Sequence, residues 1–168
     1  MQTFRARFRL LREVKVSELI DAIGVYVLWD ADAKDYPSYI GWGTILRSLA
    51  KYAERHDQGS AHPWNCYIAI MKGCTAQATR TESDTVGGML MGVANDIFPL
   101  FHANVRPDMT AFHCQKTQRV AISGWDPFAA PNRPVSRRHE IRVRRVENGY
   151  SIGHTWRPRP TRVRTRSN

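Results

Sequence analysis

Hydrophobic positions in the first third of the chain predict a β-hairpin. Residues 25–29 are β-branched or aromatic, residues 30–37 are mainly polar and end in proline, and residues 38–40 resume a short apolar run. Two such runs separated by a polar segment are typical of paired strands. The hairpin would place Tyr26 and Tyr39 on neighbouring strands.

A helix is predicted directly after this hairpin, over residues 44–56. Its apolar residues recur with helical period and define one buried face, made of Ile45, Leu46, Leu49, Tyr52 and Ala53. Arg47 lies opposite the middle of that face, and Lys51 and Arg55 follow it at i+4 and i+8. A basic stripe of this kind is typical of a solvated helix surface, and it also suits contacts with phosphate.

Two further elements follow in the same half of the chain. Residues 64–71 are rich in strand formers, and residues 80–98 have the spacing of a helix with one core-facing stripe. Glu82 falls at the N-terminal end of that stripe, where a carboxylate would overhang the edge of the core, and Asp96 lies near its far end. Thr79 and Glu82 also have the spacing of a capping box, so helix capping is the alternative role of this acid.

Basic residues alternate with apolar ones at the start of the chain. Arg5, Arg7 and Arg9 interleave with hydrophobic positions over residues 4–10, which predicts an edge strand with one basic face. Such a face is more often a solvated surface than a phosphate-binding one.

The last third of the chain predicts a strand at residues 118–122 and a β-hairpin over residues 140–152 that turns at Asn148-Gly149. Arg142 and Arg144 share one face of this hairpin. The tail beyond it is rich in arginine and proline and carries no acidic residue, so we expect it to be disordered when free and to contact the phosphate backbone without reading sequence. The tail arginines expected to make these contacts are Arg157, Arg159, Arg162 and Arg164.

The composition indicates a class of binding partner but says little about catalytic activity. A chain of 168 residues with a formal net charge of +10 and a pI near 10.1 favours a polyanionic partner, with nucleic acid ahead of an anionic membrane surface. The three cysteines show no CxxC spacing, so neither a disulfide framework nor a cysteine-rich zinc site is indicated. No stretch has the apolar length needed to span a bilayer, and we expect a soluble protein of the cytoplasm with no membrane partner.

Gly24-Val25-Tyr26 and Tyr39-Ile40-Gly41, followed by an arginine-bearing helix, resemble the paired signature of the GIY-YIG nuclease family, and the resemblance covers roughly residues 22–104. It implies an α/β (α+β) fold in which a small three-stranded antiparallel sheet is flanked by helices. We therefore expect a nuclease domain over residues 1–105, a C-terminal extension over residues 106–156 with its β-hairpin packed on the core, and a basic tail over residues 157–168.

The resemblance also implies a division of chemical roles. Tyr26 would pass a proton from the attacking water, helped by nearby positive charge that lowers its pKa, while Tyr39 would position the water or the phosphate. Arg47 would donate a planar charged fork to phosphate oxygens, with Arg55 as its substitute. Glu82 would hold a single Mg²⁺ or Mn²⁺, an ion that prefers oxygen ligands.

These roles predict a divalent-metal-dependent DNA endonuclease without a small-molecule cofactor. Lys51, Arg55, Arg142, Arg144 and the tail arginines would add contacts to DNA. The family often places its acid nine residues before a proline, whereas Leu90 stands nine residues before Pro99 in this chain. The alternative is therefore a non-catalytic nucleic-acid-binding protein on a degenerate version of the same fold, and an RNA-associated basic protein of another fold is a third hypothesis.

Overall fold

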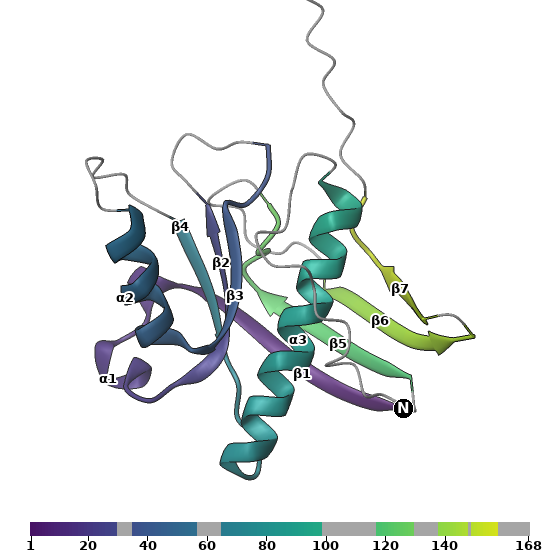
Figure 1. The fold of residues 1–168 in the computed structure, drawn as a ribbon, viewed down its shortest axis with the longest axis horizontal. Helices are drawn as coiled ribbons and strands as arrows, with labels where there is room; N and C mark the ends of the chain where they lie inside the picture. Colours follow the sequence, from purple (N-terminus) through teal and green to yellow (C-terminus); the bar gives the residue numbers. More distant parts are fainter. Residues whose placement is uncertain (30–34, 57–64, 99–116, 130–137, 148, 158–168) are drawn as a thin grey trace, which may run out of the picture.

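The computed structural model describes residues 1–29, 35–56, 65–98, 117–129, 138–147 and 149–157, and within these the side chains of residues 51–56 and 65 are left out. The elements in chain order are β1 (Gln2–Leu10), the 3-10 helix η1 (Leu11–Glu13), α1 (Val16–Leu19), β2 (Ile23–Trp29), β3 (Tyr39–Thr44), α2 (Ile45–His56), β4 (Asn65–Ile70), α3 (Ala76–Ile97), β5 (Gln118–Gly124), β6 (His139–Val146) and β7 (Gly149–His154) (Figure 1).

The strands form one curled, mixed sheet with the order β3-β2-β4-β1-β5-β6-β7. All neighbouring strands are antiparallel except β1 and β5, which run parallel from Gln2 opposite Gln118 to Phe8 opposite Gly124. The expected small three-stranded sheet flanked by helices is therefore wrong. Strands β3, β2 and β4 are present as an antiparallel group, but they form only one end of a seven-stranded sheet.

The prediction of an edge strand at the start of the chain is also wrong, because β1 lies in the middle of the sheet. It pairs with β4 through Arg9 opposite Ile68, and with β5 along nearly its whole length. Alternation of apolar and basic residues fixes which face each side chain takes, but it does not identify the strands on either side. Those partners lie far away in the sequence.

One face of the sheet is covered by α3, which crosses it from β3 toward β7 (Figure 1). Apolar side chains of alternate strand positions meet the buried stripe of the helix in one core, whose members include Phe8, Val27, Leu90, Val120 and Ile141. The core thus takes side chains from strands on both sides of β1. No helix in the described ranges is long and apolar enough to cross a membrane.

Helix α3 begins earlier than predicted. The hydroxyl of Thr75 accepts a hydrogen bond from the amide of Ala78 at 3.0 Å, which makes Thr75 the N-cap. Thr79 lies within the helix, and its hydroxyl donates to the Thr75 carbonyl at 2.8 Å. The capping-box alternative for Thr79 and Glu82 is therefore excluded.

Among the described elements, the helices on the opposite face of the sheet, α1 and α2, lie at its β3-β2-β4 end. Apolar residues of α1 and α2 pack there on the side chains of β2 and β4, in a second cluster that includes Leu19, Tyr26, Leu28, Ile45 and Ile68. The predicted third strand and C-terminal hairpin are confirmed as β4 and as the antiparallel pair β6 and β7.

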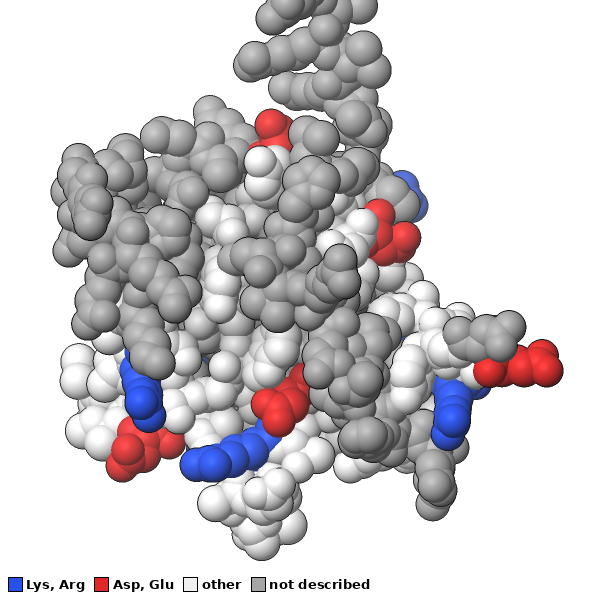
Figure 2. Space-filling view, viewed as in Figure 1, with Lys and Arg blue, Asp and Glu red and all other residues white. Residues whose placement is uncertain are grey.

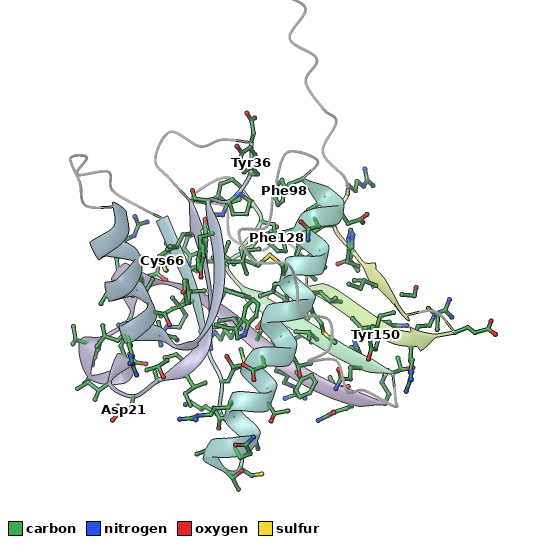
Figure 3. The ribbon with its side chains drawn as sticks, in the orientation of Figure 1. Asp21, Tyr36, Cys66, Phe98, Phe128 and Tyr150 are labelled. Carbon is green, nitrogen blue, oxygen red and sulfur yellow. The ribbon has the colours of Figure 1, made fainter. Side chains whose placement is uncertain are left out.

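Aromatic side chains close the end of the core beside the C-terminus of α3. Phe98 and Phe128, labelled in Figure 3, have ring centroids 5.8 Å apart, and Phe128 in turn lies 5.2 Å from Trp156. Asp126 organises this group, because its carboxylate accepts hydrogen bonds from the Trp156 indole at 3.0 Å and from the Phe128 amide at 2.9 Å. His139 stacks on Trp156 and places Nε2 3.3 Å from the same carboxylate.

Replacing Gly87 by alanine should destabilise the fold, because an added Cβ would lie 2.4 Å from the ring of Trp42 on β3. Overpacking costs about 1–3 kcal/mol, which outweighs the helix-propensity gain of at most about 1 kcal/mol. Gly92→Ala is the matched control, since its added Cβ meets only the mobile end of Ile152. Urea unfolding should show a lower midpoint for Gly87→Ala alone; equal midpoints would contradict this packing.

The carboxyl group of Asp126 should make the stability of the fold depend on pH in the acidic range. Burial alone would raise its pKa, but the hydrogen bonds from His139, Phe128 and Trp156 outweigh burial and hold the pKa below the ordinary value of 3.8. A lowered folded-state pKa stabilises the protein above that ordinary value, and this contribution is lost as pH falls through the folded-state pKa. Thermal melts should therefore show Asp126→Asn less stable than wild type at pH 7, with the gap narrowing below about pH 3.8. A gap that stays constant down to pH 2 would contradict the assignment.

Candidate functional site

Tyr26 and Tyr39 lie side by side on β2 and β3, as the sequence predicts. Their rings stack with centroids 5.9 Å apart and planes 25° apart. Gly41, the strand partner of Tyr26, makes room for this arrangement: a Cβ there would lie 2.2 Å from the Tyr26 hydroxyl. Hydrogen bonding links the Tyr26 hydroxyl to Tyr39 and to Ser48 of α2.

The environment of Tyr26 acts against ionisation. Its side chain is only 2% exposed, and burial, followed by the neighbouring Tyr39, raises its pKa well above the ordinary value of 10.0. The expectation that positive charge lowers this pKa is therefore wrong. Tyr39 is half-buried and is the member of the pair that solvent reaches more easily.

Arg47 lies in the first turn of α2 and is exposed, on the face opposite the buried Ile45. The start of the helix is held in place because the amide of Ile45 donates to the Ala22 carbonyl at 2.9 Å. No described contact joins Arg47 to either tyrosine. Lys51 and Arg55 continue α2, but their side chains lie outside the described part of the structure.

Glu82 lines a cleft of about 990 Å³ that contains none of the other predicted catalytic residues. The cleft is bordered by β1, β4, β5, α1 and α3, and its lining residues are Thr3, Arg5, Arg7, Arg9, Val14, Glu18, Ile68, Ile70, Lys72, Glu82 and Ser123. Glu18 is already engaged, because it forms an ion pair with Arg9 at 2.7 Å. The structure therefore brings Glu82 together with basic side chains, and not with Tyr26, Tyr39 or Arg47.

The cleft and the tyrosine pair nevertheless share one face of the sheet. Ile68 is the strand partner of Tyr26 on one side and of Arg9 on the other, so the three residues form one row across β2, β4 and β1. Adjacent strands are about 4.8 Å apart, which places the backbones of Tyr26 and Arg9 roughly 10 Å from each other.

The surroundings of Glu82 do not fit the expected Mg²⁺ or Mn²⁺. Such an ion needs several oxygen ligands, usually carboxylates. Here the cleft is lined instead by the basic side chains of Arg5, Arg7 and Lys72. Its other carboxylate, that of Glu18, is paired with Arg9. Burial also raises the pKa of Glu82, which disfavours the charged form that would bind the ion. No cluster of three ligand-type side chains occurs among the described residues.

The substitute acid, Asp96, lies elsewhere. It is near the C-terminal end of α3, where its carboxylate contacts Nε2 of His154 on β7 at 2.5 Å. It therefore links the helix to the edge of the sheet, and it does not line the cleft of Glu82.

Arginines dominate the face of β1, β5 and β6 that points away from α3. Alternation along each strand sends the apolar residues into the core and leaves the intervening positions on the other side. We name this surface the arginine face, and its basic residues are Arg5, Arg7, Arg9, Arg119, Arg142 and Arg144. On the α3 side, shown in Figure 2, the described Lys and Arg side chains stand apart from one another.

Small residues lie opposite several of these arginines, although Arg119 and Arg142 are direct strand partners. Arg5 has Ala121 as its strand partner and Arg7 has Ser123. On β7, Gly153 is opposite Arg142 and Ser151 is opposite Arg144. The guanidinium groups therefore project from a surface with little other side-chain bulk.

Only part of this positive charge is neutralised. Glu140 forms ion pairs with both Arg119 and Arg142. Arg5, Arg7 and Arg144 are exposed and make no ion pair with any other described residue. A concentration of unpaired guanidinium groups on an open surface is typical of an anion-binding site.

Sequence patterns identified only part of this surface. Arg142 and Arg144 were expected to contact DNA, and the structure places them on the arginine face. Arg119 and Lys72 were not predicted as site residues, since their role depends on which strands are neighbours. Arg157 is exposed, whereas Arg159, Arg162 and Arg164 lie outside the described residues.

Comparison with known proteins assigns no family to this arrangement: no protein-family model, curated protein or solved structure matches the chain.

Proposed function

We propose that this protein binds nucleic acid through phosphate contacts made by the arginine face. The observation that carries the proposal is the set of exposed guanidinium groups on β1 and β6, of which Arg5, Arg7 and Arg144 have no described acidic partner. Guanidinium groups bind phosphate oxygens in a bidentate geometry that lysine cannot reproduce. The net charge of +10 favours the same class of partner.

Contacts of this kind position a nucleic acid without reading its sequence. Arg157 follows β7 at the end of the described chain, and the arginines after it would add further phosphate contacts. We place this binding inside the cell, in keeping with the free thiols of Cys66 and Cys74.

Removing two unpaired arginines should weaken binding to duplex DNA and flatten its salt dependence. Each phosphate contact contributes about 0.9 to the slope of log affinity against log salt. The Arg5→Gln/Arg7→Gln variant should therefore lose roughly 1.8 from that slope. Fluorescence anisotropy across a salt series measures this change, and an unchanged slope would remove the arginine face from the binding surface.

Arg144 and Arg145 provide a matched comparison on one strand. They are adjacent and both exposed, but alternation places only Arg144 on the arginine face. Arg144→Gln should reduce the slope by about 0.9, whereas Arg145→Gln should leave it unchanged. An equal effect of the two substitutions would indicate a response to net charge alone.

A second candidate function is DNA cleavage, favoured by the stacked pair of Tyr26 and Tyr39 beside α2. The row that joins Tyr26 to Arg9 through Ile68 would bring a strand bound at the arginine face close to this pair. Tyr39 is the more accessible ring, so we assign it the contact with phosphate or water. Arg47 would stabilise charge in the transition state.

If cleavage occurs, Tyr39→Phe and Arg47→Ala should each reduce it by on the order of 10² to 10³, because each removes one transition-state contact. Plasmid nicking in Mg²⁺, with EDTA as the metal-free reference, measures the effect. Arg80→Ala is the control, since Arg80 is exposed on α3 and belongs to neither site. Full nicking by folded Tyr39→Phe and Arg47→Ala proteins would exclude this pair from catalysis.

A further inference from the structure

The cleft beside β1 contains unpaired charges of both signs. Arg5, Arg7 and Lys72 lack an acidic partner among the described residues, and Glu82 likewise forms no ion pair there. Arg9 and Glu18 neutralise each other at 2.7 Å. A ligand that complements the remaining charges must offer an anionic group to the basic side chains and a hydrogen-bond donor to Glu82.

The cleft also has an apolar wall. Ile70 of β4 is half-buried and faces the cleft, while Ile68 and Val14 lie buried behind it in the cluster under α1 and α2. A volume of about 990 Å³ is at the upper end of the range that holds small ligands. This combination suits a flat ring that carries a phosphate at one end and an amino group at the other.

We propose that this cleft binds one unpaired nucleotide, with its phosphate at Arg5 and Arg7, its base against Ile70, and an exocyclic amino group donating to Glu82. The inference deepens the proposed function and depends on it, because the same arginines hold the strand. Phosphate contacts alone carry no sequence information, whereas a carboxylate that accepts from cytosine N4 does.

Base preference follows from the chemistry of Glu82. Cytosine, adenine and guanine have an exocyclic amino group and thymine has none, so a thymine in the cleft would leave the carboxylate without its donor. Burial already raises the pKa of Glu82, and a donated hydrogen bond would favour its charged form again. Glu82 is therefore the residue that would determine specificity.

The test compares oligo(dC) with oligo(dT) of equal length at fixed salt and pH 8. One good pair between side chain and base is worth about 1–3 kcal/mol, so wild type should bind oligo(dC) about fivefold or more tightly than oligo(dT). Glu82→Met, which keeps the length of the side chain without an acceptor, should bring this ratio close to one. Asp84→Asn is the control, because Asp84 is exposed on the same helix and does not line the cleft.

Free dCMP and dTMP, added as competitors, identify the source of the nucleotide. Displacement of oligo(dC) by dCMP but not by dTMP would show that a mononucleotide is a sufficient ligand. Absence of displacement, alongside a preference that depends on Glu82, would assign the nucleotide to a bound strand.

A wild-type ratio near one, or a ratio that survives Glu82→Met, overturns the inference. If duplex DNA binds in an arginine-dependent manner while neither oligonucleotide binds, the proposed function stands and the nucleotide site does not. If no nucleic acid binds, both are overturned.

Discussion

The pairing of β1 between β4 and β5 is the constraint on which the rest of the sheet depends. It joins the strands that precede α3 to the strands that follow it, through one antiparallel and one parallel ladder. Its register also assigns the two faces: Phe4 and Phe8 enter the core, and Arg5 and Arg7 take the other side. A slip of one residue would exchange these sets and bury guanidinium groups among apolar side chains, at a cost that the core could not offset.

Helix α3 is fixed relative to this sheet by a buried hydroxyl. Ser83 is fully buried, donates to the Gly24 carbonyl at 2.7 Å and accepts from the Gly43 amide at 3.2 Å. These two bonds tie the helix to the start of β2 and the end of β3. Because Glu82 precedes Ser83, a rotation that moved Glu82 out of the cleft would break both bonds. The position of the acid is thus a consequence of how the helix is anchored.

Local sequence patterns predicted the elements of this fold better than their arrangement. The hairpin with Tyr26 and Tyr39, the strand β4 and the C-terminal hairpin all follow from runs of strand formers and from turn residues. The parallel pairing of Gln2 with Gln118 has no local signal, since the partners are more than a hundred residues apart. The same limit applies to the arginine face, because Arg119 joins Arg142 only through the order of the strands.

The sequence likewise predicted some features of the candidate site and not others. The placement of Tyr26 and Tyr39 on neighbouring strands could be predicted from the runs of strand formers. The stacking of their rings and the burial of Tyr26 could not, because Ile45 and Leu49 of α2 pack in the same cluster as Tyr26. The helical period placed Glu82 near the edge of the core. Only the tertiary structure shows that its neighbours in the cleft are arginine and lysine side chains. Positive neighbours oppose a bound cation and favour a ligand that is itself anionic.

The burial of Tyr26 and the exposure of the arginines also determine which of these side chains could act on the same ligand. Tyr26 lies in the same row as Arg9, yet its side chain is buried, and burial raises its pKa further above neutral pH. Arg5, Arg7 and Arg144 are open to solvent, and under the proposed function they would hold a phosphate before any chemistry begins. A group that acts on that phosphate must reach it from the solvent side of the tyrosine pair, which favours Tyr39. On the proposed function, binding would therefore persist without cleavage, whereas cleavage at this face would require the arginine contacts to be made first.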